Sequence, residues 1–411
     1  MNNTKEFEKI LLNRFLYSVG ILILIRMGTF LPVPGIDHNE LAFYIQRHSI
    51  AKNIISTFSG DNTFVIGLFT LNIFPYINAT IAIQLLVGLS PKLSKLQKEG
   101  DFAGGRTIAR LTRGITLILA IIQSVGVALY LRQILFDWNI FLAGEIVLWL
   151  TTGAMIILWL SELITDYGLG NGSSLLIYTN IVANLPNLLK GVINLNGSNI
   201  FLTIGLAITI LVSLYGIIYL NKGLLKIPLI SSKQLNQSAI RDQGNNYLPL
   251  RYNQAGVMPI ILTTTMLVIP NYLISLDIFQ SLRFLSGYKF IYWIGYFGLI
   301  VTFSSFYASV VLKPKELSDQ LQRLAVAIPG VRPGLQTNFY LKRVINRITF
   351  IGSIMLAVIT VVPNFIESTF NIAGLNGLST TSLLIIAGVI LDLVREIDNI
   401  YYSTVYSKSY D

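Results

Sequence analysis

The sequence contains no cysteine, which excludes disulfide bonds, thiolate nucleophiles and cysteine-based metal sites. Histidine is almost as scarce, because only His38 and His48 occur, and both fall in one expected loop, too few for a metal centre by themselves. Charged residues make up only 12% of the 411-residue chain, whereas 53% of its residues are hydrophobic. One soluble core rarely buries so many apolar side chains, so this composition indicates a polytopic membrane protein.

The common catalytic sequence patterns are also missing. The chain has no HExxH, no GxSxG and no Walker-type glycine loop, and no expected membrane span carries a pair of carboxylates. The glycine-rich stretch GLGNG at 168–172 follows Asp166 and Tyr167 at the end of an expected span, where a helix terminator is favoured over a phosphate-binding loop. We therefore expect a protein that is not an enzyme and that uses no cofactor and no metal.

Long apolar runs dominate the chain instead. Windows of about 20 apolar residues, enough to cross a hydrocarbon core of ~30 Å, occur at ten places: 15–33, 74–89, 111–131, 144–161, 173–190, 201–221, 256–275, 290–312, 344–363 and 379–395. Of the 30 Lys and Arg residues, 23 lie on the side of the amino terminus and six on the other side. By the positive-inside rule the amino terminus is cytoplasmic, and the net charge of +10 reflects topology rather than direct binding of nucleic acid.

The order of these spans predicts an all-α polytopic membrane protein with ten transmembrane helices in one membrane domain. A break near residues 190–200 permits two inverted five-span halves, 1–190 and 200–411. Loops 222–255 and 313–343 are longer than a helix connection needs, and both face the side of the amino terminus. Connections of this length are usually functional or mobile.

One apolar segment is interrupted where a membrane helix would normally be continuous. It starts at Phe58, reads FSGDNTFVIGLFTLNIFPYINATIAIQLL, and contains Gly60, Gly67, Asn72 and Pro75. Irregular backbone at membrane depth is tolerated only where it lines a cavity or packs inside protein, because lipid offers no hydrogen-bond partners. We therefore expect an apolar half-segment before the second span and a pathway beside it.

Charged side chains are nearly absent from the expected spans, which disfavours a proton-coupled carrier. Polar side chains instead mark two spans and could hydrogen-bond across a helix interface for about 0.6–2 kcal/mol each, weakly enough to open. Ordinary interhelical packing explains any single one of them equally well. These residues are Asn78, Thr80 and Gln84 in the second span, and Thr263, Thr264 and Thr265 in the seventh.

Several longer motifs follow one another along the chain: RMGTFLPVPGID at 26–37, FPYINATIAIQLL at 74–86, DYGLGNGSSLLI at 166–177, LPLRYNQAGVMP at 248–259 and a long one at 306–334. In this order they resemble the SecY family, the channel subunits of bacterial and plastid protein-translocation complexes. The resemblance extends from the first span to the last, ending in TTSLLIIAGVILDLVREIDN at 380–399.

The resemblance implies an hourglass of ten helices that opens sideways toward lipid between the second and seventh spans. Residues about 57–71 match the plug of the family, a short helix that fills the external funnel. The positions of its constriction ring carry isoleucine throughout: Ile73, Ile77, Ile177, Ile261 and Ile385. Branched apolar side chains in a ring give a seal without sequence preference.

The resemblance also implies a docking site for the motor ATPase SecA or a ribosome in the loop at 313–334. Arg332 occupies the position associated with coupling to the partner, and Lys313, Lys315 and Arg323 supply surrounding charge. The loop at 233–246 departs from the family pattern, because it keeps only two basic residues where relatives carry several.

The function implied is a protein-conducting channel that passes unfolded polypeptides and inserts apolar segments into the lipid bilayer. The implied partners are a SecE-like single-helix subunit, with or without a SecG-like subunit, the SecA motor, and ribosomes of the SRP pathway. A composition rich in Ile, Asn, Lys and Tyr favours a plastid-encoded protein of the thylakoid membrane over one of a bacterial inner membrane. Two other classes stay open: a secondary transporter of a small solute, and a scaffold without a pore.

Overall fold

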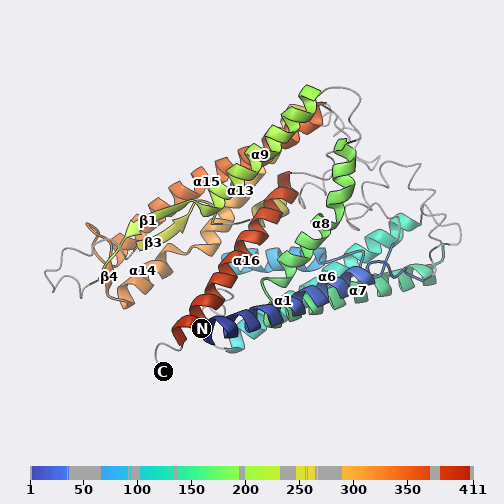
Figure 1. The fold of residues 1–411 in the computed structure, drawn as a ribbon, viewed down its shortest axis with the longest axis horizontal. Coiled ribbons are helices and arrows are strands. Elements are labelled where there is room, and N and C mark those ends of the chain that lie inside the picture. Colours follow the sequence, from blue (N-terminus) through green and yellow to red (C-terminus); the bar gives the residue numbers. More distant parts are fainter. Residues whose placement is uncertain are drawn as a thin grey trace. The chain divides into compact units, whose positions relative to one another are not determined.

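A computed structural model of the chain describes residues 2–34, 36, 66–90, 93, 102–132, 138–193, 200–231, 247–254, 256, 258–263, 266, 289–370 and 380–407. These residues are mostly helical, as the sequence predicts (Figure 1). The long helices are α1 (Asn2–Gly28), α4 (Phe74–Leu89), α6 (Phe102–Leu131), α7 (Ile140–Tyr167), α8 (Gly172–Ile193), α9 (Ile200–Lys222), α13 (Lys289–Val311), α15 (Leu335–Phe370) and α16 (Thr380–Ser407).

These helices overlap nine of the ten expected spans. The remaining span, expected at 256–275, is helical over 258–263, and most of the rest lies outside the described residues. Five described segments are long and apolar enough to cross a membrane: Phe7–Gly28, Gly104–Leu129, Ile140–Tyr167, Tyr292–Arg323 and Leu335–Ile366. The chain is thus a multi-pass membrane protein, while the count of ten spans stays a prediction.

Several helices extend beyond the apolar windows from which they were predicted. Helix α6 begins at Phe102 rather than at 111, and α15 runs from Leu335 to Phe370 with Pro363 inside it. Polar residues can continue a helix outside the hydrocarbon region, so an apolar window underestimates its length. Proline is tolerated within membrane helices because neighbouring groups satisfy the freed carbonyl.

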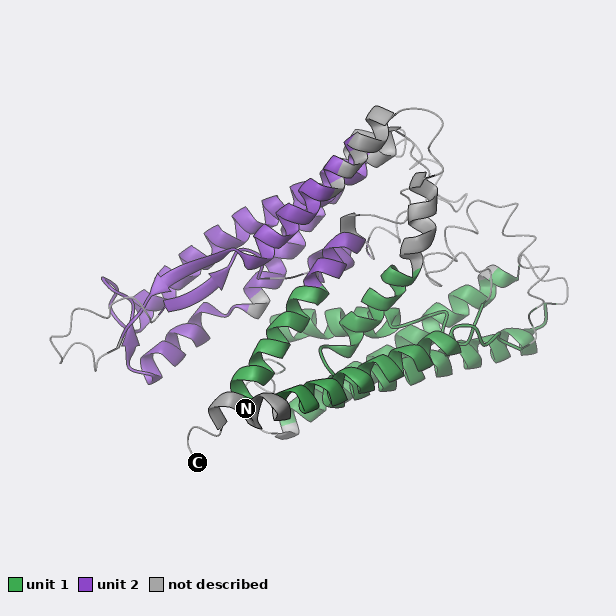
Figure 2. Cartoon of the chain, viewed as in Figure 1, with its two compact units in different colours: residues 1–187, 389–411 green, residues 188–388 purple. Residues whose placement is uncertain are grey.

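The chain divides into two compact units, residues 1–187 with 389–411 and residues 188–388 (Figure 2). In the first unit, α4 packs against α6, α6 against α7, and α1 against α7. Its core is built from apolar side chains that are almost fully buried, including Ile66, Leu71, Leu131, Ile146 and Leu150. The Oγ atoms of Ser124 and Thr151 lie 3.0 Å apart and link α6 to α7.

In the second unit, α15 packs against both α13 and α9. Its core combines Ile217 and Leu220 of α9 with Tyr296 and Ile300 of α13 and with Leu356 of α15. All five side chains are buried. Apolar burial of this kind, at about 25 cal/mol per Å² in water, does not drive helix association within lipid, where close packing does so instead.

The described residues are mostly helical, and short strands occur in the two long loops of the second unit, where the prediction of an all-α protein had placed none. Strand β1 (Leu224–Pro228) pairs antiparallel with β3 (Tyr247–Arg251), and β2 (Ile230–Ser231) pairs antiparallel with β4 (Val326–Ala327). A short helix, α14 (Pro314–Arg323), precedes β4. The pairing of β2 with β4 joins the loop 222–255 to the loop 313–343, so the two loops form one folded substructure.

A small core holds this substructure together. Ile227 of β1 and Leu250 of β3 are buried with Leu321 of α14 and with Leu341 and Ile345 of α15. In β3 the exposed residues alternate with more buried ones, as one buried sheet face requires, whereas in β1 only Ile227 is buried. Each strand is too short for that alternation to stand out in the sequence.

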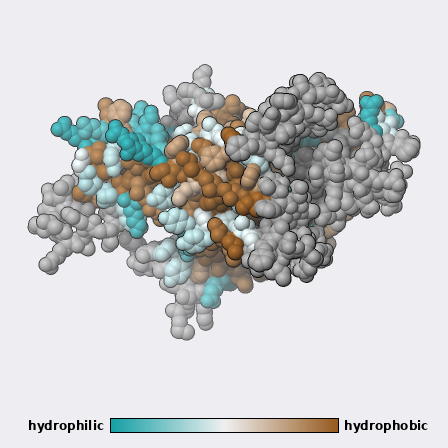
Figure 3. Space-filling view, turned by 90° about the horizontal axis from the view of Figure 1, so that it is seen from above, coloured by the Kyte–Doolittle hydropathy of each residue, from teal (hydrophilic) through white to brown (hydrophobic). Residues whose placement is uncertain are grey.

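Large apolar side chains also cover much of the outer surface. Figure 3 shows them in brown over a broad stretch of the described surface. Exposed examples on long helices are Phe141 and Leu148 of α7, and Leu211 and Tyr215 of α9. In water, apolar patches of this size would promote aggregation, whereas contact with lipid explains why they are exposed.

Candidate functional site

The interrupted segment before α4 is described from Ile66 onward. Gly67 forms an isolated bridge with Pro32, and residues 68–73 form turns. The described residues of this segment thus contain no helix before Phe74, and the short plug helix stays a prediction. Residues 57–65 of the expected plug lie outside the described residues. The backbone N–H of Val33 donates to the carbonyl of Ile66 at 3.1 Å, and that of Leu68 donates to the carbonyl of Leu31 at 2.9 Å. Hydrogen bonds to the segment that follows α1, which ends at Gly28, thus hold residues 66–68.

Helix α4 begins directly after this turn. Asn72 adopts a left-handed backbone conformation with φ of 50°. Its Oδ1 atom accepts a hydrogen bond of 2.8 Å from the backbone N–H of Ile73. Pro75 lies in the first turn of α4, where its missing N–H costs no helical hydrogen bond. These local features explain why the second span starts at Phe74.

The five isoleucines of the expected ring have two kinds of environment. Ile73 and Ile77 are only 2% and 3% exposed. Ile177 in α8, Ile261 in the helix 258–263 and Ile385 in α16 are half-buried. The first three belong to the first unit and the last two to the second, and each unit is described by itself. The ring therefore stays a prediction.

Two of the polar residues predicted for the gate spans bond within their own helices. The hydroxyl of Thr80 donates to the carbonyl of Ile77 at 2.8 Å, and that of Thr263 donates to the carbonyl of Pro259 at 2.7 Å. The hydrogen bonds expected across an interface are thus not made by these two donors. Asn78 is half-buried, and Thr264 and Thr265 lie outside the described residues.

Gln84 differs from these threonines. Its Oε1 atom is buried and accepts no hydrogen bond from the residues that the structure describes. An acceptor left unsatisfied in a buried position costs about 1–3 kcal/mol. Of the polar residues predicted in α4, Gln84 therefore has the strongest physical reason to contact a further group.

Asn253 positions the start of the helix 258–263, a role that the sequence analysis missed. Its Nδ2 group donates to Oδ1 of Asn221 at 3.0 Å and to the carbonyl of Gly256 at 3.1 Å. Asn253 is buried, and it links the end of α9 to the turn before the next helix. The sequence signal for this role was the asparagine in the motif LPLRYNQAGVMP, because an amide side chain that is buried needs specific hydrogen-bond partners.

The basic residues predicted for docking lie on α14 and on the loop after it. Lys313 precedes α14, and its Nζ lies 3.6 Å from Oε1 of Glu316. Lys315 and Arg323 are exposed on the same helix, and Arg332 is exposed on the loop that leads to α15. The structure thus presents the positive charges of Lys315, Arg323 and Arg332 to solvent.

The loop that carries Arg332 is tied down on both sides. The hydroxyl of Ser318 in α14 donates to the carbonyl of Gly334 at 3.0 Å, and that of Thr337 in α15 donates to the carbonyl of Arg332 at 3.0 Å. Gly330 and Gly334 have φ of 77° and 101°, backbone conformations that residues other than glycine rarely adopt. Arg332 is therefore held in a defined loop, which lowers the ordering cost of binding a partner.

Apolar side chains accompany these charges, a feature that the sequence analysis did not single out. Leu335 and Phe339, one turn apart at the start of α15, are 78% and 69% exposed. Leu324, just after α14, is exposed as well. Arginine and large aromatic side chains are enriched at the interface positions that contribute most to binding, so this combination is typical of a docking surface.

One ion pair lies within helices that were expected to carry almost no charge. Nε of Arg113 in α6 lies 2.8 Å from Oε1 of Glu162 in α7. The apolar window 144–161 ended one residue before Glu162. Arg113 lies near the start of the window 111–131 but was counted with the preceding loop, so the sequence did not reveal the pair. Both side chains are partly exposed, and such a pair contributes only about 0.2–1 kcal/mol. It aligns α6 and α7 rather than forming a transport site.

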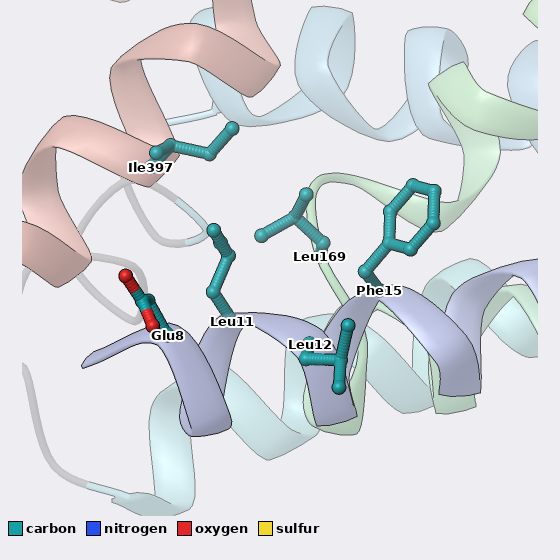
Figure 4. Close-up of a pocket in the computed structure, with 6 residues that line it drawn as sticks. All are labelled: Glu8, Leu11, Leu12, Phe15, Leu169 and Ile397. Atoms are coloured by element: carbon teal, nitrogen blue, oxygen red, sulfur yellow. The ribbon is translucent and has the colours of Figure 1, made fainter. Parts of the chain in front are cut away.

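A pocket of about 330 Å³ lies between α1, the turn after α7, and α16. In Figure 4 the side chains of Leu11, Leu169 and Ile397 approach one another, and Glu8 is the one charged residue among those shown. A pocket for a polar solute needs several convergent polar groups, which this lining does not offer. Within the described ranges, no three His, Asp or Glu side chains gather as metal ligands would.

The sequence model of the SecY family matches residues 67–394. "Protein translocase subunit SecY" of Trieres chinensis is 55% identical over 98% of both chains. Its counterpart in Guillardia theta is 42% identical over 96% of both chains. The counterpart in Synechococcus elongatus is 37% identical over 96% of this chain and 93% of the relative.

Solved structures share the fold at low sequence identity. "The structure of a protein conducting channel" matches with a TM-score of 0.66 at 16% identity, over 97% of this chain and 94% of that one. "Sec61 in the Canine ribosome-channel complex from the endoplasmic reticulum" matches with a TM-score of 0.61 at 15% identity, over the same shares. The class is thus a multi-pass membrane protein with the fold of protein-conducting channels. Within that class, the chain belongs to the SecY family.

Proposed function

We propose that this chain is the channel subunit of a protein translocase, which passes unfolded polypeptides across a membrane and releases apolar segments sideways into lipid. The observation that carries this proposal is the SecY family match over residues 67–394. As such a subunit it is not an enzyme, and the energy for transport comes from a partner. The interrupted span before α4, packed inside protein, is the local feature that fits a pathway.

The proposed seal is a ring of the five isoleucines. Ile73 and Ile77 follow directly from the turn that precedes α4, and the other three lie on α8, on the helix 258–263 and on α16. Apolar side chains at a constriction exclude water and ions, and they offer a passing polypeptide no specific hydrogen bonds. Such a seal closes without selecting one sequence of cargo.

The proposed lateral gate lies between α4 and the helix 258–263. The buried, unsatisfied Oε1 of Gln84 supports this role, because a donor across the gate would satisfy it when the gate is shut. Thr80 and Thr263 already bond within their own helices, so they add little to the closing energy. A gate held by few hydrogen bonds can be opened by an apolar segment of cargo.

The proposed docking surface consists of Lys313, Lys315, Arg323 and Arg332 with the neighbouring Leu335 and Phe339. Its partners are the SecA motor and ribosomes of the SRP pathway, and the channel itself is clamped by a SecE-like helix with or without a SecG-like subunit. One solved structure with this fold is that of Sec61 in a ribosome–channel complex, which supports the proposal. Plastid and cyanobacterial relatives favour the thylakoid membrane as the location.

The experiment that tests the channel replaces Ile77 and Ile261 by glycine. The purified complex is reconstituted in liposomes, and ion flux is measured without cargo or motor. We expect the double variant to leak ions, because two branched side chains are lost from the seal. As a matched control, Ile118 and Ile294 are replaced by glycine, since each is 56% exposed on a long helix.

The three classes of protein predict different results in this assay. A channel leaks with the first pair of substitutions and stays tight with the control pair. A solute carrier shows altered uptake of its solute without a general leak, and a scaffold shows no change in conductance. Equal flux in all variants would rule out the proposed seal.

A further inference from the structure

The turn at residues 66–72 is held more firmly than a loop beside a pore would require. Every residue in it except Leu68 is buried. The turn makes backbone hydrogen bonds to Leu31 and Val33. Within the turn, the hydroxyl of Thr70 donates to the carbonyl of Gly67 at 2.7 Å. The backbone N–H of Asn72 donates to the carbonyl of Phe69 at 2.9 Å. The turn is therefore internally bonded and also bonded to the segment that follows α1.

The same turn touches two neighbours at glycine positions. A Cβ atom added to Gly153 of α7 would lie 2.0 Å from the carbonyl oxygen of Leu68. One added to Gly67 would lie 2.2 Å from the carbonyl oxygen of Thr29. Both obstacles are backbone atoms, which cannot swing away as the end of a side chain can. The backbone of the turn thus lies directly against the backbones of α7 and of Thr29, which follows α1, and neither contact leaves room for a methyl group.

The residues that follow the turn are two of the five ring isoleucines. Asn72, the last residue of the turn, has a left-handed backbone conformation, and its side-chain Oδ1 accepts a hydrogen bond from the N–H of Ile73. The N–H of Ile77 in turn donates to the carbonyl of Ile73 at 3.1 Å. The turn is thus linked to Ile73 and, through the first helical hydrogen bond of α4, to Ile77.

We propose that residues 66–72 form a fixed anchor that positions Ile73 and Ile77, and that Gly153 and Asn72 are positioning residues for the seal. This inference rests on the proposed function of the two isoleucines. The anchor works by contact: Gly153 admits the Leu68 carbonyl against α7, and Asn72 sets the direction in which α4 starts. The rest of the interrupted segment, before Ile66, is not part of the anchor.

The test compares Gly153→Ala with Gly144→Ala, two changes in the same helix. A Cβ at Gly144 meets nothing within 4 Å, so this variant controls for the added methyl group. Resting ion flux of reconstituted complexes is measured for each, together with the yield of assembled complex.

We expect Gly153→Ala to raise resting ion flux roughly tenfold, which corresponds to ~1.4 kcal/mol lost from the closed state. Gly144→Ala should stay at the level of the unmodified protein. Ile77→Gly is included as the positive control for the seal. If Ile77→Gly leaks and Gly153→Ala does not, the anchor is overturned while the proposed channel stands. If Ile77→Gly does not leak, the proposed channel fails, and the anchor fails with it.

A second pair of variants decides the matter if Gly153→Ala does not assemble. Asn72→Gly keeps easy access to a positive φ and loses only the side-chain hydrogen bond, whereas Asn72→Ala loses both. We expect flux to rise in the order unmodified protein, Asn72→Gly, Asn72→Ala. Equal flux in Asn72→Ala and the unmodified protein would overturn the positioning role of Asn72 and, with it, the anchor.

Discussion

Replacing Ser18 of α1 by alanine should loosen the turn between α7 and α8. The Oγ atom of Ser18 accepts a hydrogen bond of 2.7 Å from the backbone N–H of Leu169 and donates one of 3.0 Å to the carbonyl of Arg14. Ser18 is 4% exposed, and Leu169 is buried. In the variant, the N–H of Leu169 would be left buried without an acceptor. Leaving a buried donor unsatisfied costs about 1–3 kcal/mol.

Amide hydrogen exchange at Leu169 measures this cost where it arises. If exchange proceeds through opening of the turn, a loss of 1–3 kcal/mol accelerates it by about 5- to 140-fold, at 1.4 kcal/mol per factor of ten. The amides in the middle of α7 should keep their rates, because their own helical bonds are unchanged. The measurement requires the assembled, membrane-embedded complex.

Ser403→Ala provides the matched control. The Ser403 hydroxyl donates to the carbonyl of Ile400 at 2.9 Å on an exposed face of α16, and removing it leaves no buried group unsatisfied. Its effect should stay within about 0.5 kcal/mol. An unchanged exchange rate of Leu169 in Ser18→Ala would refute the reasoning, because it would mean that this hydrogen bond does not hold the turn.

Three further predictions concern the second unit and the gate. Gly352→Ala should lower the thermal unfolding midpoint of the complex, because its Cβ would meet the Tyr252 carbonyl at 2.1 Å, whereas Gly298→Ala, with nothing within 4 Å, should not. Arg332→Glu should abolish motor-driven export and leave assembly intact, and normal export would remove the docking proposal. Cysteine pairs scanned along α4 and the helix 258–263 should yield a disulfide that blocks transport; transport that continues after cross-linking would rule out the lateral gate.

The helices could be predicted because their apolar runs are long. Runs such as 74–89 exceed anything that a loop would carry, and α4 indeed spans Phe74–Leu89. The end of α7 was also predictable, since GLGNG follows it: Gly168 caps α7, and Oδ1 of Asn171 accepts from the N–H of Ser173 at the start of α8. Local signals of this kind need no knowledge of the rest of the fold.

The strands and the anchor could not be predicted, because their residues are joined by distant contacts. Ile230 finds its strand partner at Ala327, almost a hundred residues further on, and neither run is long enough to show a period. Gly153 looks like any small residue in an apolar helix until the carbonyl of Leu68 is placed against it. Arg113 and Glu162 likewise lie on different helices and reveal their pairing only in three dimensions.

The most direct test of the channel places a photo-reactive amino acid at Ile77 and stalls a polypeptide during transport. If α4 begins at a polypeptide pathway, the stalled chain should form an adduct at position 77, and the adduct should disappear when transport is completed. The same probe at Ile118, which is exposed on α6, should label lipid instead. A stalled polypeptide that labels position 118 but never position 77 would contradict a pathway past this isoleucine.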